Sequence, residues 1–168
     1  MRFQAMLGAA TMLAVCLSTL APGSVAAHSG AESIVTVSAE SLSSGSTASG
    51  FGDALNEMRA RNGLGSLRED VHLTRAAQAY AEDMARHAYF SHTGRDGSTV
   101  TTRARGAGCR GRGYFAENIA WGQKTAQAAF SGWAASAGHR DNMLGRNYGV
   151  FGLGQSNGMW VLIFADDC

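Results

Sequence analysis

The sequence predicts a single α+β domain that occupies residues 51–168. Apolar residues recur at helical spacing in the first part of this region, which indicates helices that pack against a core. The last part contains two apolar runs separated by a turn signal, which indicates a β-hairpin that closes the chain. A region of about 118 residues is long enough to build one hydrophobic core. Helices first and a hairpin last therefore argue for the α+β class.

Residues 1–27 have the pattern of an export signal. Arg2 precedes the apolar stretch from Met6 to Leu20, and Val25 and Ala27 fit the −3 and −1 positions of a signal-peptidase site. An apolar stretch of about 15 residues is shorter than the roughly 20 that a membrane-spanning helix needs. We therefore expect a cleaved signal, no transmembrane anchor after cleavage, and a protein that is secreted or periplasmic. A retained anchor is the alternative.

The cysteines support one disulfide. Cleavage after Ala27 removes Cys16 and leaves Cys109 and Cys168 in an oxidising compartment, where thiols pair. A Cys109–Cys168 bond would close a loop of about 60 residues, worth roughly 4 kcal/mol by the chain-entropy relation. A lipoprotein attached through Cys16 is the alternative, although Val15 is larger than the small residue that such a site usually has.

Charge excludes one class of partner. The chain has 14 Lys+Arg, 13 Asp+Glu and a formal net charge of +1, which becomes zero if the signal carries Arg2 away. The arginines form no run of five or six, so nucleic acid is not an expected partner. The most cationic stretch predicts a solvated loop face, or alternatively a contact with an anionic surface; it contains Arg103, Arg105, Arg110 and Arg112.

The first elements after the signal are a leader and two helices. Residues 28–50 contain eight Ser, three Gly and no aromatic residue, which is typical of a linker. The first helix starts at Phe51 and stops at Asn62-Gly63. A loop follows, and the second helix runs from Val71 to about His87. Its buried stripe comprises Leu73, Ala76, Ala77, Tyr80, Ala81 and Met84.

The remaining elements are shorter. Residues 89–113 read as loop, with Ser98 capping a short helix that ends at Arg105. A helix is predicted from Thr125 to Ser136, because Ala128, Ala129 and Trp133 share a face. The final strands are predicted at Tyr148–Gly154 and Met159–Ala165, joined by a turn that contains Asn157-Gly158.

Three polar residues in apolar or glycine-rich surroundings could carry chemistry: His92, Glu117 and His139. Two imidazoles and a carboxylate are the ligand types of a zinc site, and equally the groups of an acid–base pair. They lie about 25 and 22 positions apart, and no His-Glu-x-x-His helix is present, so spacing alone decides neither. Taken singly, each residue is typical of a structural or surface position.

The segments around these residues resemble motifs of the CAP superfamily, the SCP-domain group that includes cysteine-rich secretory, antigen 5 and pathogenesis-related proteins. The motifs are Tyr89-Phe90-Ser91-His92, Ala116-Glu117-Asn118-Ile119-Ala120-Trp121 and Gly138-His139-Arg140-x-Asn142-Met143-Leu144. The segment from Leu55 to Leu64 and Gly152-Leu153-Gly154 add to the likeness, which is greatest to the short, secreted bacterial branch. The resemblance implies an α-β-α sandwich with a small antiparallel sheet.

The resemblance also implies a cleft lined by His92, Glu117 and His139, with these three residues as ligands of a divalent cation such as zinc, calcium or magnesium. Eukaryotic members carry a second Glu three residues after a Trp, and here that position, counted from Trp133, is Ser136. The missing carboxylate lowers the expected affinity for a cation, and water would have to complete its coordination.

Three functions remain open. The first is a non-enzymatic binding module for a lipid or sterol, a cell-envelope glycan or a protein, with no catalytic residue assigned. An apolar groove for a lipid could draw on four aromatic residues, which are more typical of a core: Phe115, Trp121, Phe130 and Trp133. The second is a hydrolase, using either a zinc-bound water or Ser136 or Ser91 with a histidine base that Glu117 orients. The third is a structural envelope module.

Overall fold

A computed structural model describes the backbone of residues 39–168 and the side chains of residues 50–168. The predicted signal peptide and the leader up to residue 38 lie outside the described residues. Among the helices of the described part, none is both long enough and apolar enough to cross a membrane.

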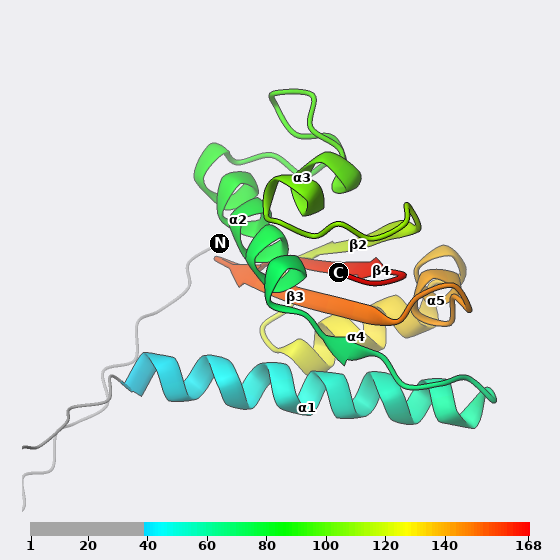
Figure 1. Cartoon of the computed structure of the whole chain (residues 1–168). Helices are drawn as coiled ribbons and strands as arrows, with labels where there is room; N and C mark the ends of the chain where they lie inside the picture. Colours follow the sequence, from blue (N-terminus) through cyan, green and yellow to red (C-terminus); the bar gives the residue numbers. More distant parts are fainter. Residues whose placement is uncertain (1–38) are drawn as a thin grey trace, which may run out of the picture. The chain divides into compact units, whose positions relative to one another are not determined.

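A four-stranded sheet with helices on both faces forms the domain, which confirms the predicted α+β class and the sandwich (Figure 1). Helices α2 and α3 cover one face, and α1, α4 and α5 lie on the other (Figure 1). The strand order is β1-β3-β4-β2, with β1 parallel to β3 and the remaining pairs antiparallel. The elements are α1 (Ala39–Arg61), β1 (Arg68–Glu69), α2 (Val71–His87), α3 (Val100–Gly106), β2 (Phe115–Trp121), α4 (Ala126–Ala135), α5 (Ala137–Met143), β3 (Val150–Ser156) and β4 (Met159–Ala165).

The sheet separates two hydrophobic clusters because alternate residues of a strand point to opposite faces. Every residue of β4 is buried. Val161 and Ile163 belong to the cluster under α2, whereas Leu162 and Phe164 belong to the cluster that includes Phe51 of α1. The central strand therefore supplies the core on both sides.

The backbone of helix α2 packs directly against the backbone of strand β3 at two glycines. A Cβ atom added at Gly152 would lie 2.2 Å from the amide nitrogen of Thr74, and one at Gly154 would lie 2.2 Å from that of Gln78. Only glycine permits this approach. The close contact fixes the height of α2 above the sheet, and α2 carries Tyr80, which reaches the functional site described below.

Several sequence predictions are confirmed at residue level. Helix α2 has the predicted bounds, and the carboxylate of Asp70 caps it by accepting from the amides of His72 and Leu73. Helix α4 has Thr125 as its N-cap. In the β3–β4 turn, Asn157 and Gly158 have φ values of 46° and 80°, as a type I′ turn requires.

Other boundaries differ from the prediction. Helix α1 begins at Ala39 and not at Phe51, so it includes the second half of the Ser-rich segment. Once a helix has a nucleus, each added residue gains one hydrogen bond, and weak helix formers can follow. The N-cap of α3 is Thr99, one residue after the predicted Ser98. The prediction did not include β1, β2 or α5.

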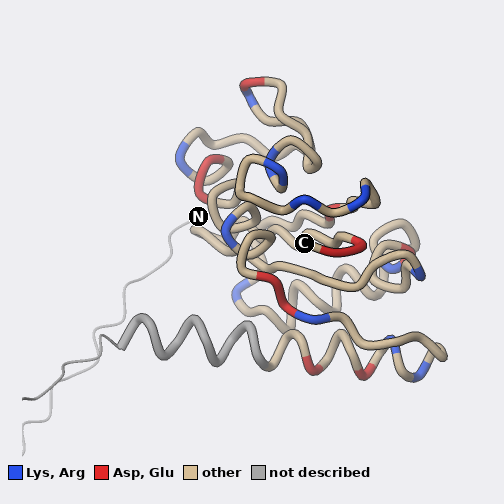
Figure 2. The backbone as a smooth tube through the Cα atoms, in the orientation of Figure 1, with Lys and Arg blue, Asp and Glu red and all other residues tan. Residues whose placement is uncertain are grey.

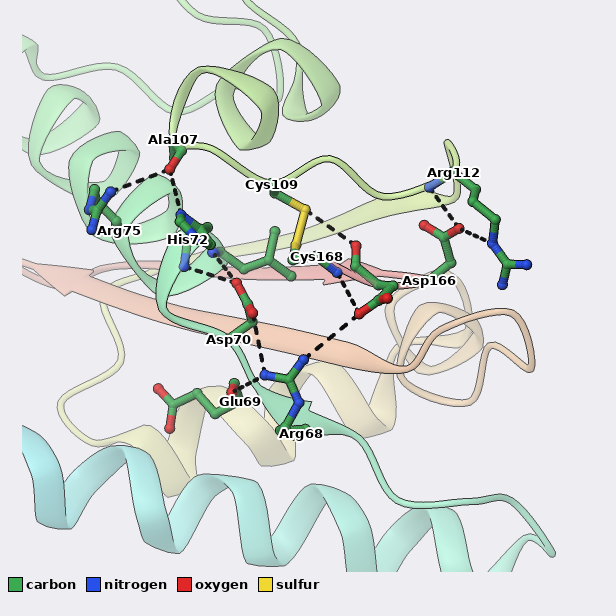
Figure 3. The surroundings of a disulfide bond; sticks show 12 residues. Arg68, Glu69, Asp70, His72, Arg75, Ala107, Cys109, Arg112, Asp166 and Cys168 are labelled. Atoms are coloured by element: carbon green, nitrogen blue, oxygen red, sulfur yellow. Dashed lines mark hydrogen bonds and ion pairs between the residues drawn. A yellow bond between two sulfur atoms is a disulfide. The ribbon is translucent and has the colours of Figure 1, made fainter.

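The predicted disulfide between Cys109 and Cys168 is present, with a Cα–Cα distance of 4.6 Å (Figure 3). It ties the C-terminal residue to the segment between α3 and β2. Next to it, the carbonyl oxygen of Ala107 is bonded by the His72 Nδ1 atom at 2.8 Å and by Arg75 at 3.3 Å. These contacts hold the end of α3 against α2.

Candidate functional site: a buried carboxylate between an imidazole and a guanidinium

Strand β2 lies at one edge of the sheet and carries the predicted acidic residue. Glu117 and Asn118 are adjacent on this strand, so their side chains point to opposite faces. Both residues are buried, and only 3% of the Glu117 side chain is exposed. A carboxylate at such a depth requires compensating partners.

Arg103 of α3 supplies the main compensation. Its Nη2 atom donates to Glu117 Oε2 at 2.8 Å and to the carbonyl oxygen of His92 at 3.1 Å. Its Nη1 atom donates to the carbonyl oxygen of Ser98 at 2.8 Å, and the guanidinium lies 3.4 Å from the ring centroid of Tyr80. Arg103 is therefore a buried cation that α2, α3 and the loop after α2 hold in one position.

His92 engages the other oxygen of Glu117. Its Nδ1 atom lies 2.8 Å from Glu117 Oε1, and more than half of the His92 side chain is exposed. The loop that carries His92 is anchored by Tyr80, whose hydroxyl donates to the carbonyl oxygen of Ser91 at 2.6 Å. Both carboxylate oxygens of Glu117 are thus bonded within the protein, and the second nitrogen of His92 is left at the surface.

His139 forms a separate pair with Ser136 at the junction of α4 and α5. The His139 Nδ1 atom lies 2.9 Å from Ser136 Oγ. Burial lowers the pKa of His139, and electrostatic repulsion with His92 adds a smaller effect in the same direction, so the neutral imidazole is favoured at pH 7. The buried Asn118 fixes this segment by donating to the carbonyl oxygen of His139 at 2.9 Å and accepting from Asn142 at 2.8 Å.

The side chains do not fit a tightly bound cation. Within the described part of the chain, no group of three or more His, Cys, Asp or Glu side chains is placed to hold a metal. Glu117 bonds His92 and Arg103, whereas His139 bonds Ser136. Ser136 adds no negative charge. A metal would have to compete with a guanidinium that the fold already supplies.

The remaining residues that the sequence singled out occupy several kinds of position. Ser91 Oγ accepts from the amide of Thr93 at 3.0 Å and has no histidine partner among the described residues. Trp133 is part of the core and donates to the carbonyl oxygen of Ile119 at 3.1 Å. Phe115 and Phe130 are half-buried against the two hydrophobic clusters, and Trp121 is exposed.

The role of Arg103 was not predicted from the sequence. Its cationic stretch predicted a solvated loop face or a contact with an anionic surface, and Tyr80 was predicted only as part of the buried stripe of a helix. The sequence signal that could have identified it was Glu117, because a carboxylate in a buried strand needs a cation as a partner. That signal could be used only if residues 115–121 were recognised as a buried strand.

The fold agrees with a comparison against protein families. The model of the cysteine-rich secretory protein (CAP) family matches residues 53–161. The chain belongs to the CAP family. It is 32% identical over 111 residues to the uncharacterized protein YkwD of Bacillus subtilis, covering 65% of this chain and 43% of YkwD. It is also 32% identical over 105 residues to the uncharacterized membrane protein YlbC of the same organism, covering 61% and 29%.

Solved structures support the CAP assignment. An extracellular protein from Bacillus anthracis that contains an SCP domain superposes with a TM-score of 0.69 at 27% identity, over 72% of this chain and 40% of that one. An outer surface protein from Borrelia burgdorferi gives 0.60 at 19% identity, over 69% and 89%, which is a likeness of fold alone. This CAP chain spans less than half the length of the Bacillus relatives.

Proposed function

We propose that this CAP domain is a non-enzymatic binding module of the cell exterior whose site takes a neutral, hydroxyl-rich glycan of the cell envelope. The observation that carries the proposal is the internal pairing of Glu117, whose two oxygens bond His92 and Arg103. A carboxylate in this state is not free to act as a nucleophile, a general base or a metal ligand.

The charge state of the site favours a neutral ligand. Glu117 and Arg103 compensate each other, and His139 is neutral at pH 7. What remains for a ligand is hydrogen bonding by imidazole nitrogens and by the Ser136 hydroxyl. Sugar hydroxyl groups donate and accept at the same atom, so they suit such partners, whereas a sulfate or a phosphate would find no unpaired cation among these groups.

Exposed aromatic rings next to the site add contact area for a sugar. Phe90 lies two residues before His92, and 47% of it is exposed. Trp121 ends β2, four residues after Glu117, and 66% of it is exposed. At about 3.3 Å per residue, Trp121 is roughly 13 Å along the strand from Glu117, a span suited to an oligosaccharide. An amphipathic ring at a surface commonly packs against a ligand while its polar edge stays wet.

The names of structural relatives support a location outside the cell. The Bacillus anthracis relative is described as extracellular, and the Borrelia burgdorferi relative as an outer surface protein. A cell-envelope glycan is the abundant hydroxyl-rich polymer that such a protein meets.

Loss of either imidazole should weaken glycan binding. We expect neutral β-1,4-linked N-acetylhexosamine oligosaccharides to bind, and His92→Ala and His139→Ala to weaken the binding about tenfold each, since one hydrogen bond is worth about 1 kcal/mol or slightly more. Titration calorimetry measures this. His87→Ala, at an exposed histidine of α2, is the matched control and should leave the affinity unchanged.

Three outcomes would overturn the glycan assignment. A sulfated oligosaccharide of the same length could bind more tightly than the neutral one, or both histidine variants could bind as well as the wild type. The purified protein could also carry a lipid, a sterol or a protein and show no affinity for the sugar. Full folding with no ligand of any of these kinds would favour the structural envelope module.

Hydrolysis is a second candidate because of one contact. The bond between Ser136 Oγ and neutral His139 is that of a nucleophile and its base. A third group should orient the base, but Glu117 bonds His92 and not His139, so the expected triad is divided between two histidines. Release of reducing ends or of an ester product, abolished by Ser136→Ala, would favour hydrolysis over simple binding.

A further inference from the structure

A cavity of about 660 Å³ lies between α2 and the segment from Arg95 to Ala107. It is lined by neither His92, Glu117 nor His139, so it is distinct from the site described above. Its volume is within the range of small-molecule pockets, roughly 300–1,000 Å³. Its apolar wall comes mainly from α2, with Ala76, Ala79 and the ring of Tyr80.

The charged side chains that line this cavity differ in how many hydrogen-bond partners they have. The two carboxylates that line it have partners: Asp83 accepts from the hydroxyl of Tyr89 at 2.5 Å, and Asp96 accepts from the amide of Ser98 at 2.9 Å. Two guanidinium groups are available by comparison. Arg75 donates only to the carbonyl oxygen of Ala107, at 3.3 Å, and Arg95 makes no hydrogen bond or ion pair with any described residue. The cavity therefore offers two guanidinium groups with free donors to a ligand.

Arg103 forms the wall between this cavity and the Glu117 site. Its side chain is nine-tenths buried and lines the cavity, and its Nε atom is buried without a hydrogen-bond partner among the described residues. A buried unsatisfied donor of this kind costs about 1–3 kcal/mol. Figure 2 shows basic positions on α2 and on the segment that includes α3, and these two parts of the chain border the cavity.

We propose that this cavity is a second ligand site, which takes a small oxyanion, a carboxylate or a phosphate, carried on a flat apolar body. Arg75 and Arg95 hold the oxyanion, and the body lies against the wall of α2 at Ala76 and Ala79. Arg103 is the wall shared with the Glu117 site, so a ligand here contacts the same guanidinium that neutralises Glu117.

Phenyl phosphate is a suitable probe, with phenol and inorganic phosphate as its two halves. We expect saturable binding of phenyl phosphate, with each half at least tenfold weaker. The double variant Arg75→Gln/Arg95→Gln should weaken phenyl phosphate about tenfold or more, because charge-assisted bonds are lost. Arg105→Gln, at an exposed arginine of α3 that does not line the cavity, is the matched control and should change nothing. Benzoate in place of phenyl phosphate distinguishes a carboxylate from a phosphate ligand.

NMR locates the bound probe. Binding should shift the Arg103 Nε–H resonance and the amides of Ala79 and Gly106. The proposal is wrong if the probe does not saturate, if Arg105→Gln weakens binding as much as the double variant, or if the shifts are confined to His92 and His139. Because glycan binding depends on those two histidines, failure of either proposal leaves the other intact.

Discussion

Replacing Arg103 with methionine should lower the free energy of unfolding by about 3–5 kcal/mol, because it leaves the carboxylate of Glu117 buried without a cation. Methionine keeps much of the apolar contact of the side chain with Tyr80 and removes the charge. Urea or guanidinium unfolding followed by circular dichroism measures the loss.

Two companion variants separate charge from packing. Arg105→Met makes the same change at an exposed position of the same helix, and it should stay within about 0.5 kcal/mol of the wild type. Adding Glu117→Gln to Arg103→Met removes the uncompensated charge and should recover part of the loss, even if the single variant fails to fold. An Arg103→Met protein as stable as Arg105→Met would contradict the assigned role.

Removal of the Cys109–Cys168 disulfide should cost about 4 kcal/mol, since the bond closes a loop with a sequence separation of 59 residues. The double variant Cys109→Ser/Cys168→Ser should melt well below the wild type, by roughly 10–20 °C for a domain of this size. Calorimetry under non-reducing conditions measures the shift.

Reduction provides the matching control for the disulfide. A reductant should lower the melting temperature of the wild type toward that of the double serine variant and leave the variant itself unchanged. Two free thiols in the unreduced exported protein, or a variant that melts with the wild type, would refute the stabilising role.

Short-range sequence patterns predicted helix α2 and the final hairpin correctly. The stripe on α2 and the Asn157-Gly158 turn are short-range signals, because a helix face and a two-residue hairpin turn are encoded within a few residues. Strand β2 was missed because its sequence places polar Glu117 and Asn118 at its centre, where a sheet pattern expects apolar residues. These two polar residues can be buried in a strand only because β2 pairs with β4 and is contacted by α3, α4 and α5.

The sequence suggested which residues belong to the candidate site, but it did not predict how they are connected. The motif likeness selected His92, Glu117 and His139, but it could not show that Glu117 bonds His92 while His139 bonds Ser136. It also omitted Arg103, which no motif contained. Long-range ion pairs depend on how α3 sits against β2, and no sequence spacing encodes that geometry.

The central claim is that Arg103, and not a metal ion, compensates the charge of Glu117. Thermal melting in the presence of divalent cations tests this claim most directly. A cation that binds only the folded state raises its stability by mass action, by about 2.7 kcal/mol at a hundredfold excess over its Kd. With Zn²⁺, Ca²⁺ or Mg²⁺ at about 1 mM, we expect the same melting temperature as with a chelator, because a site with Kd well above that concentration stabilises little. A rise in melting temperature that His92→Ala and His139→Ala both abolish would contradict the claim that Arg103 takes the role of a metal beside Glu117.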